Sequence, residues 1–221
     1  MGTMTANISA SQVKELREKT GAGLLDCQKA LGEAEGDLDR ALRLLREKGL
    51  AKAAKRASRV ASDGQVGAYI HPGGKIGVLV EVNCETDFVA KTDEFQQLVR
   101  DLAMQVAATS PRYVRRDEVP EAEQESERAI YRVQAEQSGK PPQVIERIVA
   151  GQLERYLKDV CLLEQPFIKQ SDRTVGDVVQ EAIARLGENV TVRRFARFQL
   201  GEAQERRPEE KENLAGGAPG A

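Results

Sequence analysis

The sequence predicts an α+β protein: an N-terminal three-helix module, then an antiparallel-sheet core with packed helices. Three observations lead to this class. Apolar residues recur at helical spacing within residues 8–50. From residue 64 they alternate with polar residues, which is typical of strands. Helical spacing returns after residue 92 and includes an inserted helical hairpin at about 121–160.

The composition excludes several classes of protein. Lysine and arginine number 33 against 35 acidic residues, so a formal net charge of −2 argues against binding nucleic acid by general phosphate neutralisation. Three isolated cysteines and one histidine cannot supply a clustered zinc site. We expect no metal, no cofactor, no membrane span and no signal peptide, and therefore a cytoplasmic protein.

The first helix of the module begins close to the N-terminus. Residues 1–7 carry no periodic pattern, and we expect them to be disordered. Ser9 is the expected N-cap, and Gln12, three residues later, completes a capping box. Glycines at 21 and 23 then end this helix.

Two more helices complete the module at 8–50. The second is expected from about Leu24 to Ala34, and the third follows Asp37 as its N-cap and ends at Gly49. The apolar side chains of Leu24 and Leu25 favour burial in the module over contact with a partner. Because the two residues are consecutive, however, one helical face cannot bury both of them fully.

A basic linker is expected at 51–63. It lies within a stretch from Arg43 to Arg59 that contains seven basic residues and one acid. A solvated helical connector is the preferred interpretation, and contact with an acidic protein surface or with RNA is the alternative.

A β-hairpin begins the core domain, which is expected at 64–200. Strands at 66–70 and 76–82 flank the turn sequence Pro72-Gly73-Gly74. Phe88 follows, between the end of a strand and a helix expected at about 92–108. Loops held by a rigid strand and helix often carry binding residues. From the residues alone, however, the preferred interpretation is that Phe88 packs into the protein's own core and that Asp87 caps a turn.

The remaining core contains the helical hairpin and a closing strand. The first arm of the hairpin should turn Ile130 and Val133 inward. A strand at 190–200 should place five residues on one face, namely Val192, Arg194, Ala196, Phe198 and Leu200. Arg193 and Arg197 should then face solvent. Residues 201–221 lack apolar periodicity and are expected to be a disordered tail.

No catalytic constellation emerges from these elements. Cys84 with His71 is the best enzymatic alternative, but no expected neighbour would lower the pKa of the thiol. We therefore assign no catalytic residue and expect a binding protein.

Four segments resemble the elongation factor Ts family of bacteria. Residues 13–23 (VKELREKTGAG) resemble its first signature, and residues 82–90 (VNCETDFVA) resemble its second. Residues 138–141 and 165–167 are similar to downstream blocks. The likeness spans roughly 8–200 in the expected order.

The resemblance implies a guanine nucleotide exchange factor for elongation factor Tu, the GTPase that delivers aminoacyl-tRNA to the ribosome. It also implies a ubiquitin-associated-like fold for the module. The module's contact positions correspond to Lys14, Arg17, Leu24 and Leu25. The segment implicated in displacing Mg²⁺ from the GTPase corresponds to Thr86, Asp87, Phe88 and Val89. No bond is made or broken in this process, so the resemblance implies no enzyme.

One departure from the family concerns the size of the core. Longer members carry two related core halves before the helical hairpin, whereas the chain between Phe88 and Gly139 has room for one. We expect a homodimer that supplies the second half and forms a two-plus-two complex, without direct contact with nucleic acid or membrane.

Two alternatives compete with exchange. A non-exchanging adaptor would bind a partner through the same module and hairpin, but it would not need Phe88 exposed. RNA binding through residues 43–59 would show a steep dependence on salt.

Overall fold

A computed structural model describes residues 8–202. The disorder expected for residues 1–7 and for most of the C-terminal tail lies outside this range. Residues 201 and 202 are described and follow the last strand. The chain is mixed helix and antiparallel sheet, so the predicted α+β class is confirmed.

The N-terminal module contains α1 (Ala10–Thr20), α2 (Leu24–Glu33) and the first half of α3 (Leu38–Arg56). The Ser9 capping box and the Asp37 N-cap are confirmed, and Gly21 ends α1 in the left-handed conformation. The buried core of the module consists of Val13, Leu16, Cys27, Ala30, Leu31, Ala34, Ala41 and Leu45.

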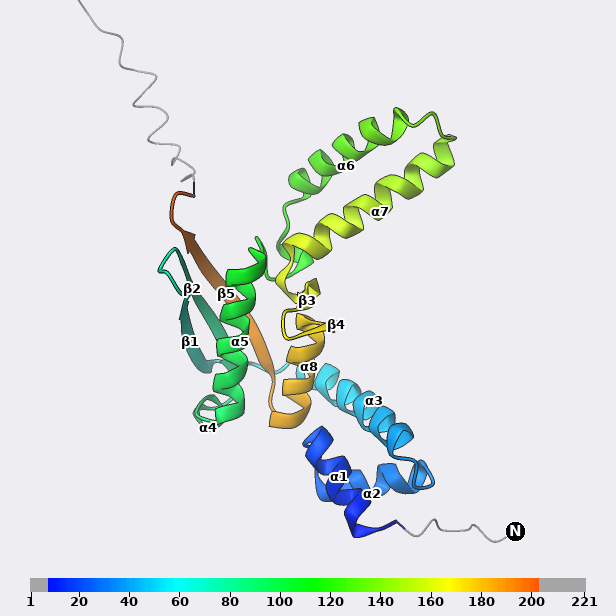
Figure 1. Ribbon diagram of the computed structural model, residues 1–221, viewed down its shortest axis with the longest axis vertical. Coiled ribbons are helices and arrows are strands. Elements are labelled where there is room, and N and C mark those ends of the chain that lie inside the picture. Colours follow the sequence, from blue (N-terminus) through cyan, green and yellow to red (C-terminus); the bar gives the residue numbers. More distant parts are fainter. Residues whose placement is uncertain (1–7, 203–221) are drawn as a thin grey trace, which may run out of the picture.

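Helix α3 does not end at Gly49, so that prediction is wrong. The helix continues to Arg56, and Ala53 is buried in the core of the second part of the chain. A Cβ at residue 49 would lie 3.3 Å from Ala184 Cβ, so this glycine permits close packing against α8 (Val175–Leu186). One continuous helix therefore joins the module to the core (Figure 1).

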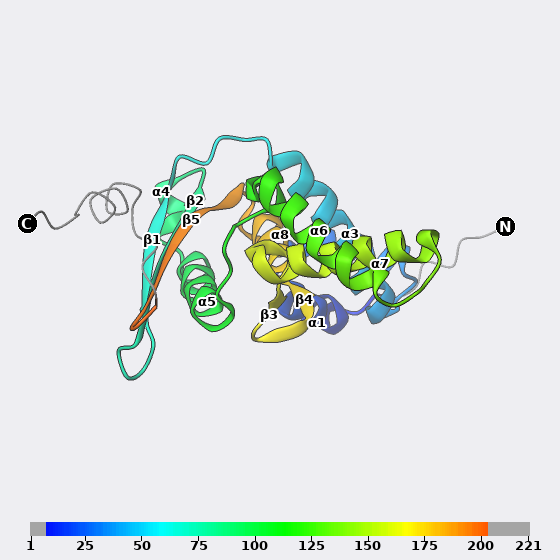
Figure 2. The same cartoon turned by 90° about the horizontal axis from the view of Figure 1, so that it is seen from above.

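The core is built on a three-stranded antiparallel sheet in the order β1-β2-β5, with β1 at Asp63–Ile70, β2 at Ile76–Cys84 and β5 at Val190–Gln199. The predicted hairpin is confirmed as β1 and β2. Helix α5 (Asp93–Thr109) packs across β1 and β2, and α8 packs against β5 and α5 (Figure 2). The buried face of β2 carries Val78, Val80, Val82 and Cys84.

A bulge in β5 overturns the predicted faces of this strand. Val82 pairs with Val192 and Glu81 pairs with Arg194, so Arg193 is an extra residue. Beyond the bulge the two faces exchange. The residues predicted to share the face of Val192 are exposed instead: Arg194, Ala196, Phe198 and Leu200. Arg197, predicted to face solvent, has a side chain only 10% exposed.

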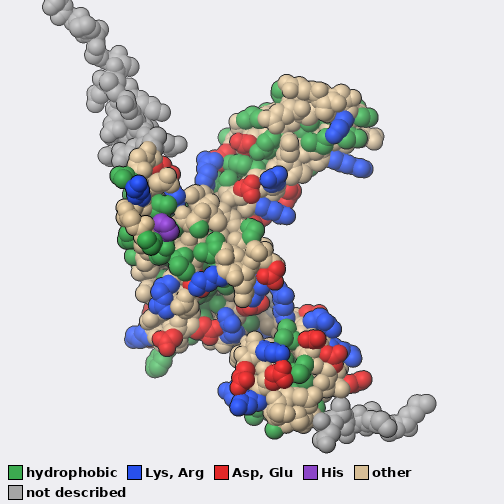
Figure 3. Space-filling view, viewed as in Figure 1, with side chains coloured by type: hydrophobic (Ala, Val, Ile, Leu, Met, Phe, Trp, Pro, Cys, Tyr) green, Lys and Arg blue, Asp and Glu red, His purple; other side chains and the backbone are tan. Residues whose placement is uncertain are grey.

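Helices α6 (Glu121–Glu136) and α7 (Pro142–Val160) form the predicted antiparallel hairpin, which projects from the core opposite the module (Figures 1 and 3). Ile130 and Val133 are 46% and 57% exposed, so their predicted inward orientation is wrong. Two helices alone can bury only a narrow strip between them. On α6 the buried residue is the small Ala135.

Short elements connect the hairpin to the core. They are two 3-10 turns, η1 (Arg116–Glu118) and η2 (Leu162–Glu164), and a small ribbon of β3 (Pro166–Phe167) and β4 (Gln170–Thr174). A further short element, α4 (Asp87–Ala90), is a single helical turn that follows β2 and contacts β1, β2 and α5. Within residues 8–202 no helix combines the length and apolar character needed to cross a membrane.

Candidate functional site

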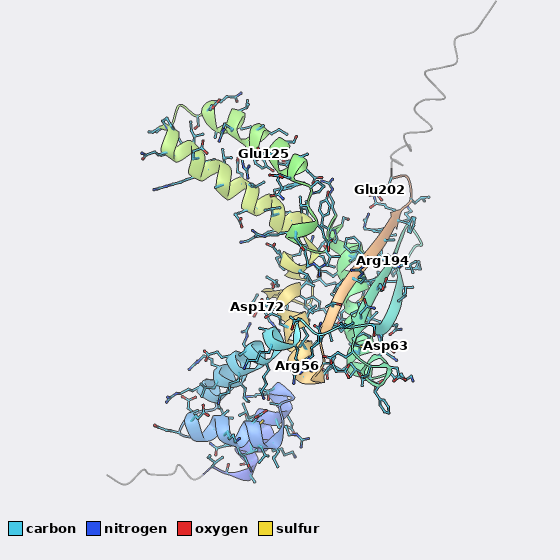
Figure 4. The ribbon with its side chains drawn as sticks, turned by 180° about the vertical axis from the view of Figure 1, so that it is seen from behind. Arg56, Asp63, Glu125, Asp172, Arg194 and Glu202 are labelled. Carbon is cyan, nitrogen blue, oxygen red and sulfur yellow. The ribbon has the colours of Figure 1, made fainter. Side chains whose placement is uncertain are left out.

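The segment after β2, residues 85–91, is termed the Phe88 segment. Its position is set by the sheet, because Cys84 pairs with Asp63 on one side and Val190 on the other. Asp63, labelled in Figure 4, marks this end of the sheet. Thr86 has extended backbone angles, and its hydroxyl accepts the amide of Val89 at 3.4 Å, so it caps α4.

Phe88 is 83% exposed, so the expectation that it fills its own core is wrong. The reason is the short helix, in which Val89 and Ala90 pack partly against the core. In a single turn, neighbouring side chains point in different directions, and Phe88 is directed into solvent. A large aromatic side chain left this exposed is typical of a binding surface.

Asp87 does not cap the turn, because Thr86 does. Its carboxylate accepts a hydrogen bond from Lys91 Nζ at 2.6 Å, four residues along the chain. This hydrogen bond lowers the pKa of Asp87 and raises the pKa of Lys91. Asp87 is therefore a carboxylate at neutral pH, held by an exposed and exchangeable partner.

A second carboxylate, that of Glu188, binds the backbone at the beginning of the Phe88 segment. Glu188, in the turn between α8 and β5, accepts hydrogen bonds from the amides of Glu85 and Thr86 and from the Thr86 hydroxyl. Sequence reasoning missed Glu188. The signal that could have found it is the pairing of β2 with β5, which brings the end of one strand beside the beginning of the other.

The four positions in the module are exposed. Lys14 and Arg17 lie on the outer face of α1. Leu24 and Leu25, at the beginning of α2, are 52% and 69% exposed, so the expectation of burial is wrong. The buried residues of α2 are Cys27, Ala30 and Leu31, whereas Leu24 and Leu25 form the first, exposed end of the helix.

The module and the Phe88 segment lie at the same end of the molecule (Figure 1). A Cβ at Gly21 would lie 3.1 Å from Arg185 Cδ of α8. The Arg185 guanidinium is 2.6 Å from the carboxylate of Glu94, on the first turn of α5. Arg56, labelled in Figure 4, joins α3 to α8 by donating to the carbonyl of Ile183 at 3.2 Å. These contacts hold the module against α8 and link α8 to the first turn of α5.

The structure does not bring together Cys84 and His71, the two residues of the enzymatic alternative. His71 lies at the hairpin turn, where its Nδ1 is 3.1 Å from the Tyr69 hydroxyl, and Cys84 lies at the other end of β2. Burial, followed by the charge of Glu188, raises the pKa of Cys84 to about 11, which disfavours the reactive thiolate. Among residues 8–202 no group of acidic, histidine or cysteine side chains could hold a metal ion.

The basic stretch from Arg43 to Arg59 is largely committed to contacts within the chain. Lys48 pairs with Glu33 at 2.7 Å, and Lys52 pairs with Asp26 at 3.0 Å. Arg59 lies 3.5 Å from Glu85 of the Phe88 segment. These partners favour a structural role for the stretch over phosphate binding.

Comparison with known proteins identifies relatives that match most of the chain. The family model described as "Elongation factor TS" matches residues 46–202. The elongation factor Ts of Carboxydothermus hydrogenoformans is 59% identical over 203 residues, which cover 92% of this chain and 94% of that protein. The elongation factor Ts of Moorella thermoacetica is 60% identical over 195 residues, with coverages of 88% and 96%. The chain belongs to the elongation factor Ts family.

Proposed function

We propose that the chain is the guanine nucleotide exchange factor for elongation factor Tu and acts in the cytoplasm. It promotes release of GDP by displacing Mg²⁺ and disturbing the phosphate contacts of the GTPase. Membership of the elongation factor Ts family supports a role in translation elongation. The 83% exposure of Phe88 carries the finer proposal, because an adaptor would not need this ring exposed.

In this proposal the Phe88 segment inserts between helices of the GTPase. The ring would leave water for an apolar pocket, as the aromatic anchors of protein interfaces do. Asp87 would exchange Lys91 for donors on the partner, at little cost because the existing pair is exposed. Thr86 and Val89 complete the contact surface on either side.

The module supplies a second contact. Leu24 and Leu25 offer exposed apolar surface, and Lys14 and Arg17 lie on the neighbouring helix with their charged groups in solvent. We propose that these four residues dock on the nucleotide domain of the GTPase while the Phe88 segment reaches the Mg²⁺ site.

Thermodynamic linkage explains how binding becomes exchange. A factor that binds the nucleotide-free GTPase more tightly than the nucleotide-bound form must weaken nucleotide binding by the same ratio. Mg²⁺ bridges protein and phosphates, so a small displacement of its ligands removes much of the affinity for GDP. No covalent bond changes on either protein, so the chain is not an enzyme in the covalent sense.

The test is stopped-flow release of a fluorescent GDP from elongation factor Tu. The parent chain should accelerate release in a concentration-dependent way, and Phe88→Ala should reduce this acceleration on the order of tenfold or more, as loss of an interface anchor does. Val60→Ala is the matched control, because Val60 is 82% exposed and lies outside both contact regions. Equal melting temperatures would show that the fold is intact.

The other outcomes distinguish the alternatives. Acceleration that survives Phe88→Ala would place the activity in the module and not in the Phe88 segment. A stable complex without any acceleration would favour the adaptor.

We also propose that two copies of the chain pair through the outer face of the sheet. No described helix covers this face (Figure 2), and it carries exposed apolar residues, namely Val66, Ile70, Leu79 and Phe198. A second copy of the same face is self-complementary under a two-fold axis. It would supply the second core half and give a two-plus-two complex with elongation factor Tu.

Sedimentation velocity tests the assembly. The parent should sediment as a dimer, and Phe198→Glu should shift it to a monomer because the new charge would be buried at the interface. Val60→Glu should leave the dimer unchanged. A parent that stays monomeric at micromolar concentration would contradict this assembly.

A further inference from the structure

We infer that Glu188 is a positioning residue for exchange: its carboxylate fixes the direction in which α4 presents Phe88 to the partner. The inference rests on the proposed exchange function and concerns a residue outside both contact regions. Three hydrogen-bond donors converge on the side chain of Glu188.

The geometry of this contact is specific. Glu188 Oε2 accepts the amide hydrogens of Glu85 at 3.1 Å and Thr86 at 3.0 Å, and Oε1 accepts the Thr86 hydroxyl at 2.6 Å. Within residues 8–202 these two amides have no other hydrogen-bond acceptor. An ionised carboxylate suits this place because it only accepts, and such charge-assisted hydrogen bonds are stronger than neutral ones.

The Thr86 hydroxyl couples this contact to the helix that carries Phe88. By donating its proton to Glu188, it directs a lone pair at the amide of Val89, which it caps at 3.4 Å. A helix of four residues is too short to be stable by itself, so its orientation depends on its anchors. Glu188 fixes the first of these anchors.

The turn that carries Glu188 is itself fixed on both sides. Gly187 ends α8 in the left-handed conformation. The amide of Asn189 donates to Glu85 Oε1 at 2.6 Å, so each turn supplies a carboxylate to the backbone of the other. The Asn189 side chain is buried and donates to the carbonyl of Arg59 at 2.7 Å, just beyond the end of α3.

Phe88 therefore stands on a support whose parts are ordered before any partner binds. A ring that is 83% exposed has few contacts of its own to hold it. Because the segment is ordered before binding, the entropic cost of ordering it is not added to the binding of the GTPase, and the ring points in one direction. Loss of Glu188 should leave docking by the module intact and impair the step that Phe88 performs.

The experiment measures GDP release as a function of the concentration of full-length variants. Glu188→Ala should lower the maximal rate on the order of tenfold, the ratio that one charge-assisted hydrogen bond represents, with the half-saturating concentration nearly unchanged. Glu188→Gln keeps the shape of the side chain and one acceptor oxygen, so its maximal rate should lie between those of the parent and Glu188→Ala. Glu181→Ala is the control, because it removes a carboxylate of α8 whose partners are Arg46 and Arg173.

Two further readouts separate positioning from general stability. Without any partner, amide hydrogen exchange should become faster in residues 85–91 of Glu188→Ala and stay unchanged in the module and hairpin. In the Phe88→Ala background, Glu188→Ala should add little, because it acts through that ring.

Each remaining outcome decides against the inference. If the parent and Glu188→Ala accelerate release equally, the positioning role is wrong and exchange stands. The same holds if Glu188→Ala slows release as much in the Phe88→Ala background as it does in the parent background. If the parent itself does not accelerate release, the proposed exchange function fails and the positioning role fails with it.

Discussion

Glu123 lies at the base of the helical hairpin, and its partly buried carboxylate links the hairpin to neighbouring side chains. It accepts hydrogen bonds from the hydroxyls of Tyr156 and of Tyr113, the latter at 2.8 Å. Arg112 binds both of its oxygens, at 2.7 and 3.0 Å. The hydrogen bond from Tyr156 is the main cause of the lowered pKa of Glu123.

This lowered pKa gives a prediction for pH dependence. A carboxylate whose pKa is lower in the folded protein stabilises it above the ordinary value of 4.5, and this contribution is lost as the pH falls through the lowered pKa. Glu123→Gln should therefore cost about 1 to 3 kcal/mol of unfolding free energy at pH 7. Urea titrations should show the difference from the parent shrinking as the pH falls below 4.5 and through the lowered pKa of Glu123.

The control for this prediction is Glu136→Gln, because Glu136 is exposed near the end of the same helix. Its difference from the parent should be small at every pH. A cost of Glu123→Gln that stays constant as the pH falls from 7 through the lowered pKa would show that the charge is not what stabilises the hairpin.

At the scale of elements, β1 packs closely against α5 at Gly67. A Cβ at Gly67 would lie 2.3 Å from Val99 Cγ1, because the inner face of the strand touches the helix at this point. Gly67→Ala should destabilise the chain by about 1 to 3 kcal/mol, since α5 must move or Val99 must leave its rotamer. Thermal denaturation should show a lower midpoint.

Gly151 provides the matched comparison. It lies within α7, and a Cβ there would meet nothing within 4 Å. Gly151→Ala should raise stability by about 0.5 to 1 kcal/mol through helix propensity. Equal effects of the two substitutions would contradict the close packing of β1 on α5.

At the scale of the whole molecule, α3 decides how the module and the core are related. Ala53 lies in its second half and is 1% exposed within the core. Ala53→Asp should cost about 3 kcal/mol or more, because it buries a charge without a partner. Loss of this packing should uncouple unfolding of the module from unfolding of the core, and the calorimetric transition should broaden or split.

Ala54→Asp is the control for this junction. Ala54 is the next residue on the same helix and is exposed, so the substitution should change the midpoint little. A single sharp transition at the parent temperature in Ala53→Asp would mean that the junction contributes little to cooperativity.

The sequence by itself determined the local features of the fold and of the site. The helix caps at Ser9 and Asp37 and the turn at Pro72-Gly73-Gly74 depend on neighbours close in the chain. The resemblance of two signatures identified the family to which the chain belongs. These features are readable because capping, turn chemistry and periodicity act over a few residues.

Only the tertiary structure decided which side chains face water and which distant groups meet. The exposure of Phe88, Leu24 and Leu25 depends on what the rest of the core fills, and propensity carries no such information. The single extra residue at Arg193 reversed the faces of β5, since strand register has a period of two. Glu188 meets Thr86 across 102 positions of sequence, because strand pairing brings two turns together, and no local pattern records that contact.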